Sequence, residues 1–503
     1  MKKQQGITLI ALVVTIVVLL ILASIGISVL VDNGGIINQS KEAKKQTEIA
    51  EEKEVLTRAS AQAAGKDVYG NIKKEELQKE LDKETGTGKA EVFDDGEILE
   101  VLFTKTNRYY SIDKDGKISD SKDVIVDKSP GDITKDENGK DLDGSEGAPF
   151  EIWCIEDLVS FSNMVNGNGK KIVDGKVIPI EEGEEFTQKY VSLKVDLNFS
   201  SRFSYMDSER TDFGDLNGNV NDGNKLITEM TTGTGFSPIG YRDWKFNGTF
   251  NGENHIITNL YEKNRTDSEV LGLFGMVKDS TIQDITVRGR IITEGDLVKG
   301  KTSAGGIVGF GSGKIRNCIS DVEIDITGYG AAGILGREHE SAEIINCVNL
   351  GTIKNTSNNN TSESTGGIVG RSESDIKIYN CYNLGDINSN GYQVGGILGY
   401  ALGKVTIVNV YNIGNIPLNG PRGRGGIVGS LGGTSFIAKI KNAYNMGNVI
   451  EENISWTYTA GGICGGLYND ATELNIEDSY YLSSTCSKAV GGKGDNEFGV
   501  KKL

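Results

Sequence analysis

The sequence has few of the residues that metal sites and acid–base catalysis require. Its 503 residues include only two histidines, His255 and His339, and six cysteines, none of which forms a C-x-x-C pair. Zinc sites use cysteines or histidines at such short spacings, so a zinc site is disfavoured. Two histidines also leave little room for proton transfer near neutral pH. We therefore predict no metal site and no cofactor.

Proline and positive charge are also scarce. Six prolines stand against 67 glycines, and because the glycines follow no G-X-Y period, collagen is excluded. Lys and Arg number 53 against 70 Asp and Glu, which gives a formal net charge of −17. Phosphate binding needs clustered basic residues, and none occurs, so nucleic acid is not expected as a partner. The length allows several domains.

Charge is absent from one long segment near the N-terminus. Residues 7–31 carry no charged side chain. As a helix this run would be about 37 Å long, enough to cross a hydrocarbon core of about 30 Å. Lys2 and Lys3 would stay cytoplasmic and place the later residues outside. The sequence therefore predicts a single-pass bacterial membrane protein with an extracellular C-terminal region. A cleaved secretory signal is the alternative, but no A-x-A site follows the run.

The segment KKQQGITLIALVVTIVVLLILA resembles the N-terminus of type IV prepilins. In that family a peptidase cuts after the glycine of a short basic leader, and the apolar helix packs in a fibre core. The resemblance implies cleavage between Gly6 and Ile7, and other pilin subunits as partners. Ala11 stands where the family has a glutamate used in assembly, which leaves incorporation into a fibre open. A plain signal-anchor helix is the alternative.

Three segments with different compositions follow the apolar run. Residues 32–64 carry charges of alternating sign and a thin apolar face, which predicts a helical stalk in solvent. Residues 65–118 contain a short helical pattern and three strand-like runs separated by D-G turns, as expected of a small α/β domain like that of pilins. Residues 119–147 are rich in Asp, Gly, Lys and Ser, and predict a linker.

Residues 148–486 are predicted to form one domain, and from Leu271 onwards it repeats one phrase. Short apolar runs framed by glycine and asparagine recur at intervals of roughly 25–40 residues, which is typical of a solenoid. The runs are too short and too rich in glycine for helices, and no crossover helices separate them. A mainly β fold, a parallel β-helix with coils about 4.8 Å apart, is therefore predicted. The glycine-framed halves are Leu271–Gly275, Gly305–Gly309, Ala332–Gly336, Gly366–Gly370, Gly395–Gly399, Gly425–Gly429 and Gly461–Gly465.

Stacked coils place equivalent residues in columns. One predicted column is polar and suits corners, because side-chain amides can hydrogen-bond from coil to coil and asparagine tolerates left-handed backbone. The next column is small and interior, with Cys318, Cys347 and Cys381 in line with alanine and valine. Buried thiols are favoured over disulfides there, although the export side of a membrane is often oxidising. The polar column comprises Asp284, Asn317, Asn346, Asn380, Asn409, Asn442 and Asp478.

The repeat resembles the GLUG motif of bacterial surface proteins, whose core is spelled by Gly272-Leu273-Phe274-Gly275. The stretch GAPFEIWCIEDLVSFSNMVNGN resembles the opening strand and capping helix of the same family. The resemblance covers roughly residues 145–486 and implies a right-handed parallel β-helix on the cell exterior. A cap at its start would cover unpaired strands and apolar core. Residues 487–503 are expected to be a C-terminal tail.

No catalytic motif is found. Some chains with this repeat are immunoglobulin A1 metalloproteases that carry HExxH, but the segment His339–Glu343 reads HESAE and lacks the second histidine. A surface loop is predicted there. The chain is therefore not expected to be an enzyme. A polysaccharide lyase or glycosidase is the alternative, although no pair of catalytic carboxylates can be named.

One column offers a candidate binding surface. Tyr382, Tyr411, Tyr444 and Tyr480 follow Ile319 and Val348 at equivalent positions of successive repeats. An exposed aromatic ladder could bind sugar rings or a partner protein. Alternatively, stacked tyrosines only stabilise neighbouring coils. The predicted function is a membrane-anchored surface adhesin or scaffold with an extracellular carbohydrate or protein ligand, by analogy with the family.

Overall fold

The structure is a computed structural model, and the chain divides into two compact units, Met1–Val124 and Ile125–Leu503. The residues that it describes are 36–67, 71–87, 89–94, 99–103, 108–113, 116–119, 122–123, 131–173, 176–199, 235–241, 243–263, 270–293, 302–356, 363–416, 423–433, 437–449, 460–468, 473–482, 484–491 and 500–502.

The first unit packs two helices on a small antiparallel sheet. Helix α2 (Ile36–Ala64) is followed by α3 (Lys74–Thr85) and by strands in the order β1-β2-β3-β4. Helix α2 ends at Ala64, where the predicted stalk 32–64 also ends, but the C-terminal half of α2 is not a free stalk. Leu56 and Ala59 are fully buried in the core of this unit, and Glu52 accepts a hydrogen bond of 2.7 Å from the Tyr110 hydroxyl. The strands are β1 (Ala90–Asp94), β2 (Leu99–Phe103), β3 (Arg108–Ile112) and β4 (Lys122–Asp123).

The predicted membrane helix and the Gly6–Ile7 bond lie outside the described residues. Among the helices that are described, none has both the length and the apolar character needed to cross a bilayer.

The second unit begins with a cap rich in phenylalanine. Helix α4 (Ile155–Asn166) is buried along its whole length. Phe161 meets Phe186 and Phe246 edge to face, with ring centroids 5.1 and 5.5 Å apart. Such contacts fill the end of the solenoid, where strands would otherwise be exposed. Around the helix lie β5 (Phe150–Ile152), β6 (Lys170–Val173), β7 (Lys176–Pro179), β8 (Tyr190–Leu193) and β9 (Leu197–Asn198).

Part of the predicted linker belongs to this cap. From residue 131 onwards the chain is folded against the solenoid: Ile133 is 1% exposed, and the Gly131 amide donates a 2.7 Å hydrogen bond to the Asp157 carboxylate. The polar composition of 119–147 was misleading because its turns satisfy their own backbone groups, as in the hydrogen bonds from the Asn138 and Lys140 amides to the Asp136 carboxylate.

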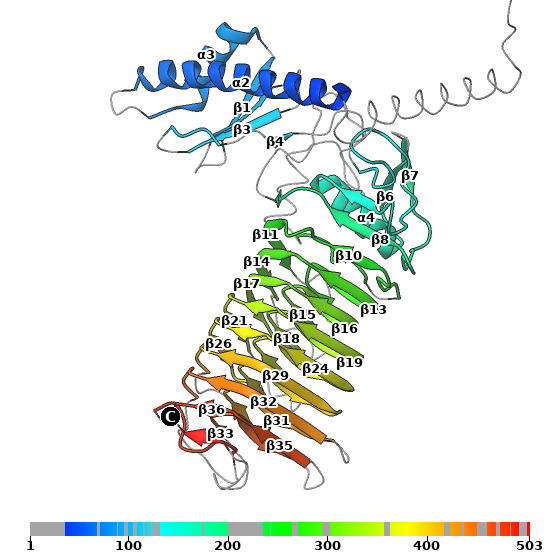
Figure 1. Ribbon diagram of the computed structural model, residues 1–503, viewed down its shortest axis with the longest axis vertical. Coiled ribbons are helices and arrows are strands. Elements are labelled where there is room, and N and C mark those ends of the chain that lie inside the picture. The colour runs from blue at the N-terminus through cyan, green and yellow to red at the C-terminus, as the bar shows by residue number, and fades with distance from the viewer. Residues whose placement is uncertain are drawn as a thin grey trace, which may run out of the picture. The chain divides into compact units, whose positions relative to one another are not determined.

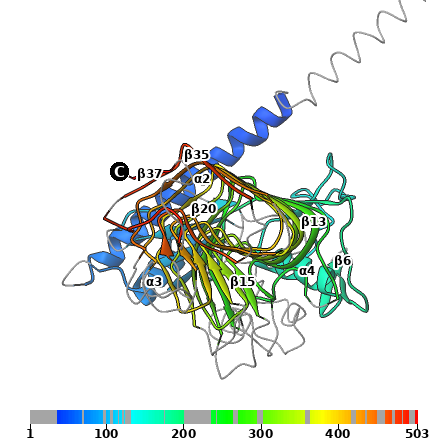
Figure 2. The same cartoon turned by 90° about the horizontal axis from the view of Figure 1, so that it is seen from below.

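The remainder of the second unit is a parallel β-solenoid, which confirms the predicted fold class (Figure 1). Seven short strands, one from each glycine-framed phrase, form one parallel sheet, and a 24-stranded sheet forms the rest of the wall. Seen from below, successive coils superimpose (Figure 2). The seven strands are β12 (Val270–Leu271), β15 (Ser303–Gly305), β18 (Gly330–Ala332), β22 (Ser364–Gly366), β27 (Gln393–Gly395), β30 (Arg424–Gly425) and β33 (Ala460–Gly461).

The strands of the larger sheet include several long ones in which buried and outward side chains alternate, as a half-buried strand requires. They are β10 (Thr249–Asn251), β11 (Ile256–Lys263), β13 (Phe274–Gln283), β14 (Thr286–Ile292), β16 (Val308–Arg316), β17 (Ile319–Ile326), β19 (Leu335–Ile345), β20 (Val348–Asn349), β21 (Ile353–Asn355), β23 (Val369–Ser372), β24 (Asp375–Tyr379), β25 (Tyr382–Asn383), β26 (Ile387–Ser389), β28 (Leu398–Ala401), β29 (Val405–Asn412), β31 (Val428–Leu431), β32 (Ile437–Asn445), β34 (Cys464–Leu467), β35 (Glu473–Glu477), β36 (Tyr480–Tyr481) and β37 (Lys501–Lys502), with β5, β8 and β9 of the cap.

The coils are in register, so that residues of the same type face one another in neighbouring coils inside the solenoid. An isoleucine pairs with an isoleucine of the next coil through six buried positions in succession. Identical apolar side chains therefore stack without gaps, and a slip of one residue would turn the whole column to solvent. The positions are Ile282, Ile315, Ile344, Ile378, Ile407 and Ile440, and Ile476 continues the column.

The chain continues its coil pairing beyond residue 486, where the tail was expected to begin. The Ile463 amide donates to the Ala489 carbonyl at 2.9 Å, and Cys464 bridges to Val490. Ala489 and Val490 are each 1% exposed. These residues form a partial last coil that covers the C-terminal end of the core.

Candidate functional site

The predicted polar column lies at one corner of the solenoid. All seven residues have left-handed backbone, with φ between 47° and 56°. The side-chain amides of Asn346, Asn380 and Asn409 each donate to the side-chain oxygen of the asparagine one coil earlier, at 3.0 Å. The chain of bonds begins at Asp284, which accepts from Asn317 at 2.7 Å, and extends to Asn442, which donates to Asn409 at 2.8 Å. The column therefore turns the chain and fixes the register of the coils.

A second asparagine ladder lies inside the solenoid and was missed by sequence analysis. Asn349, Asn383 and Asn412 each donate to the oxygen of the asparagine one coil later, at 2.7–2.8 Å, and the last acceptor is Asn445. Each amide also donates to the carbonyl of the glycine two residues on, at 2.9–3.0 Å. An N-x-G spacing common to four repeats was the signal.

In the four coils that carry this inner ladder, the second residue of the phrase is a glycine that packs against a ladder asparagine. A Cβ on Gly367 would lie 2.3 Å from Asn383, and one on Gly396 would lie 2.4 Å from Asn412. No side chain tolerates such contacts, so the second glycine of the phrase is required wherever the buried amide is present.

The four tyrosines of the candidate surface share one column between the two ladders. Tyr382 and Tyr411 stack with ring centroids 4.2 Å apart, and Tyr444 and Tyr480 stack at 5.3 Å with 7° between their planes. Tyr444 is 42% exposed, and the other three are half-buried. Because the rings within each pair cover one another, the flat faces inside each pair are not open to sugar rings.

An aliphatic column lies beside the tyrosines and was also missed. Its members stand two residues after each tyrosine position and include Leu350, Ile413 and Met446, which are 38, 40 and 53% exposed. We define the tyrosine–aliphatic face as the two columns together. Its residues are Val348, Tyr382, Tyr411, Tyr444 and Tyr480, with Leu350, Leu384, Ile413, Met446 and Leu482.

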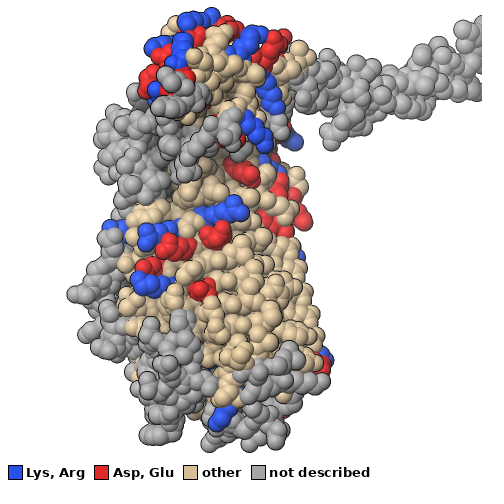
Figure 3. All heavy atoms as spheres, turned by 90° about the vertical axis from the view of Figure 1, so that its left-hand side faces the viewer, with Lys and Arg blue, Asp and Glu red and all other residues tan. Residues whose placement is uncertain are grey.

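Charge changes along this side of the solenoid. Coils nearer the cap carry exposed ion pairs across neighbouring strands, Arg288–Asp321 and Arg290–Glu323 at 3.5 Å. Leu350 follows Asp321 in the same column, and later members are apolar. Figure 3 shows charged atoms gathered over the earlier coils and a broad uncharged area over the later ones. Large exposed apolar patches are rare on soluble proteins unless they bind something.

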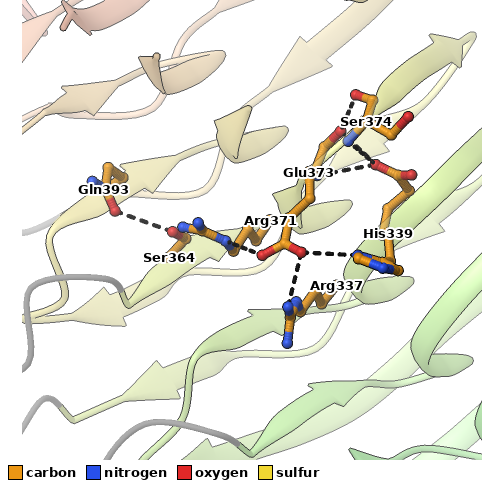
Figure 4. Close-up of polar contacts among 9 residues, drawn as sticks. Arg337, His339, Ser364, Arg371, Glu373, Ser374 and Gln393 are labelled. Carbon is orange, nitrogen blue, oxygen red and sulfur yellow. Dashed lines mark hydrogen bonds and ion pairs between the residues drawn. The ribbon is translucent and has the colours of Figure 1, made fainter. Parts of the chain in front are cut away.

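A separate cluster combines charged side chains, whose polar contacts are drawn in Figure 4, with the ring of Tyr329. The Glu373 carboxylate accepts hydrogen bonds from Arg337 at 2.8 Å and Arg371 at 2.9 Å, and lies 3.1 Å from Nδ1 of His339. The Tyr329 ring lies between the two guanidinium groups, 4.7 and 4.5 Å from their central carbons. His339 is on strand β19, so the predicted surface loop is wrong: the segment continues a coil wall.

The neighbouring Glu338 holds the backbone around Glu373 in place. Its side chain accepts from the Ser372 hydroxyl at 2.7 Å and from the Glu373 and Ser374 amides at 3.1 and 3.0 Å. These bonds satisfy backbone amides in the short gap between β23 and β24. Burial raises the pKa of Glu338. Burial also opposes ionisation of Glu373, but hydrogen bonds from Arg337 and Arg371 outweigh it and hold the pKa of Glu373 at about 2.

The two carboxylates of this cluster are engaged by other parts of the protein. Glu338 is 0% exposed and cannot touch a ligand, while Glu373 is committed to three cationic or polar partners. His255 lies 3.0 Å from Asp196, in a turn. Within the described ranges, no three His, Cys, Asp or Glu residues are grouped in a way that could hold a metal ion.

Comparisons with known proteins identify a motif at the N-terminus and a similar solved structure. Residues 1–27 match the family model for the prokaryotic N-terminal methylation motif. No curated protein matches the chain. Among solved structures, a "putative immunoglobulin A1 protease" from Bacteroides ovatus is similar at 17% identity with a TM-score of 0.37, covering 73% of this chain and 88% of that one.

Proposed function

We propose, with the N-terminal methylation motif as the premise, that this chain is a bacterial surface protein that displays its solenoid as an adhesin or scaffold. Cleavage between Gly6 and Ile7 would free an apolar helix that anchors the chain in the membrane. The helix-and-sheet arrangement of the first unit is in keeping with a pilin-like architecture. The coils are proposed to be GLUG-type repeats, on the strength of their glycine-framed phrases.

The observation that carries the binding role is the tyrosine–aliphatic face. Tyr444 and Met446 are exposed and stand two residues apart on an acidic protein. Among the described residues, the ion pairs of Arg288 and Arg290 do not recur within the face, although Lys441 and Glu477 pair at 3.1 Å on the other side of the Asn442 corner. Tyrosine and methionine are enriched in the centres of protein interfaces, whereas Lys, Glu and Asp are depleted there. A stacked tyrosine is also rigid, so little conformational entropy is lost when a partner covers it.

A protein partner fits this surface better than a sugar does. Sugar rings stack on open aromatic faces, but here Tyr382 covers Tyr411 and Tyr444 covers Tyr480. Ring edges, hydroxyls and flexible aliphatic side chains suit the uneven apolar surface of a protein. We therefore propose an extracellular protein as the ligand. Binding to a carbohydrate is the alternative that the experiment distinguishes.

The test uses the full chain, solubilised in detergent, against a panel of purified extracellular matrix proteins and against a glycan array. Met446→Glu should weaken binding to the protein ligand by at least tenfold, because a charge would be desolvated at the contact. Lys377→Ala, an exposed residue of β24 outside the face, is the matched control and should leave binding unchanged.

Circular dichroism must show that the Met446 variant keeps its fold. Binding that is insensitive to Met446→Glu would remove the face from the proposal. Glycan binding that is lost in Tyr411→Ala would assign the face to carbohydrate instead.

A further inference from the structure

Three cysteines of successive coils form a column inside the solenoid. Cys318, Cys347 and Cys381 are all fully buried as thiols. The residues before them are bonded from coil to coil, since Asn346 donates to Asn317 and Asn380 donates to Asn346, both at 3.0 Å. The residues after them are paired strands, with Val348 between Ile319 and Tyr382. Each cysteine is therefore held in register from both sides.

This register brings neighbouring cysteines within disulfide range. Adjacent parallel strands are about 4.8 Å apart, and disulfides span Cα separations of roughly 4.4–6.8 Å. The side chains also lean along the column: the Cys347 amide lies 3.4 Å from Sγ of Cys381, and Sγ of Cys347 lies 3.6 Å from the carbonyl of Ile315 in the preceding coil. The sulfur of Cys381 therefore lies against Cys347, and the sulfur of Cys347 leans toward the preceding coil, which carries Cys318.

We propose that Cys347 forms a single disulfide, either with Cys318 of the preceding coil or with Cys381 of the following coil. Val410 continues the column beyond Cys381 and Ile285 precedes Cys318, so no other member can take part. Cys318 and Cys381 are separated by a whole coil and cannot join without it. One cross-link therefore always includes Cys347 and always leaves one thiol.

The reaction needs a disulfide as oxidant. A cysteine thiolate attacks that disulfide and forms a mixed disulfide, and one thiol leaves. The second cysteine thiolate then attacks the mixed disulfide, and the second thiol leaves with the electron pair. Two cysteines lose their protons and two electrons, and one disulfide becomes two thiols.

The structure places this step during assembly of the coils. All three sulfurs are fully buried in the folded chain, so a dissolved disulfide could reach them only before the coils close. An encounter with the oxidant outside the cell depends on the proposed export. The experiment below uses purified chain, so its result does not depend on where the protein resides.

The full chain is unfolded in denaturant with reductant, then refolded in a glutathione redox buffer, and remaining thiols are alkylated. Trypsin separates the three cysteines, because Arg337 lies between the first two and Lys354, Arg371 and Lys377 lie between the last two. Mass spectrometry without reduction should find Cys347 linked to Cys318 or Cys381. Cys318→Ala should retain the link to Cys381, and Cys381→Ala the link to Cys318.

Cys347→Ala should abolish the cross-link and still fold, because Ala443 occupies the same column in a later coil. Cys464→Ala, in a buried thiol of β34 outside the column, is the control and should leave the cross-link intact. Complete alkylation of all three cysteines in the refolded chain, or a link between Cys318 and Cys381 in Cys347→Ala, would overturn the proposal.

Discussion

At the scale of single residues, asparagine has two different roles in this protein. On the outside, Asn380 has φ 53° and bonds to the coils on both sides. On the inside, Asn383 has its amide buried and fully engaged. Buried amides are stabilising only when their partners are all present. The two ladders therefore lock each coil to its neighbours more strictly than apolar packing alone.

Asn380→Ala should lower the free energy of unfolding by about 3 kcal/mol, since left-handed backbone costs alanine roughly 1 kcal/mol and each lost hydrogen bond costs roughly 1 kcal/mol. Asn380→Gly should lose less, because glycine adopts this φ without strain. Urea unfolding of the full chain measures both. Asn388→Ala, at an exposed position of β26, is the control, and an equal loss there would show that the ladder has no special role.

The outer ladder was predicted from the sequence, whereas the inner one was missed although its N-x-G spacing recurs in four repeats. Asn346, Asn380 and Asn409 follow an isoleucine-rich run at the point where a corner is needed, so spacing alone identified them. Asn383 follows a tyrosine in an apolar stretch, where a polar residue is normally assigned to the surface. Its burial depends on the missing Cβ of Gly367, which comes from a different part of the same coil.

At the scale of elements, a side chain of the neighbouring coil bonds to the backbone where a strand of the solenoid wall is interrupted. β19 is continuous, but the next coil interrupts the equivalent wall between β23 and β24, and Glu338 of β19 caps the free amides there. The same break turns Glu373 toward Arg337 and Arg371. The segment His339–Glu343 was predicted to be a surface loop, whereas it lies within β19. His339 meets Glu373 of the next coil there at 3.1 Å.

The Glu373 cluster predicts a pH dependence of stability. The folded-state pKa of Glu373 is about 2, below the ordinary value of 4.5. Its contribution is therefore present above pH 4.5 and is lost as the pH falls toward 2. Glu373→Gln should have a lower melting temperature than wild type at pH 7, by on the order of a few degrees, and this difference should shrink below pH 4.5.

Melting followed by circular dichroism at several pH values measures the effect. Glu343→Gln, on β19 outside the cluster, is the matched control. A difference between Glu373→Gln and wild type that stays constant from pH 7 to pH 2 would contradict an ionised Glu373.

At the scale of the whole molecule, two units of different construction share one chain. The first has a helix-and-sheet core, and the second has a continuous core that runs from the cap to the last partial coil. The solenoid was predictable because its period recurs seven times. The cap boundary was not, because residues 131–147 carry almost no apolar side chains besides Ile133 and Leu142, and they fold through turns and backbone bonds.

The N-terminal methylation motif predicts that the whole chain is processed at its N-terminus. In a host with a prepilin-type peptidase, the mature chain from the membrane fraction should begin at Ile7, and Gly6→Val should leave it starting at Met1. Intact-mass spectrometry distinguishes the outcomes. A wild-type start at Met1 would indicate a simple anchor, and a start after Val31 would indicate release from the membrane.

The stacked register has a consequence for how such a molecule can change its size. The ladder step from Asn380 to Asn409 spans 29 residues, and each coil bonds only to the one before and the one after. Duplicating or deleting one such stretch would rejoin both ladders and the isoleucine column, because neighbouring coils carry the same residues at these positions. The reach of the solenoid is thus adjustable in single-coil increments, and unequal recombination between repeats offers a direct route to longer and shorter forms.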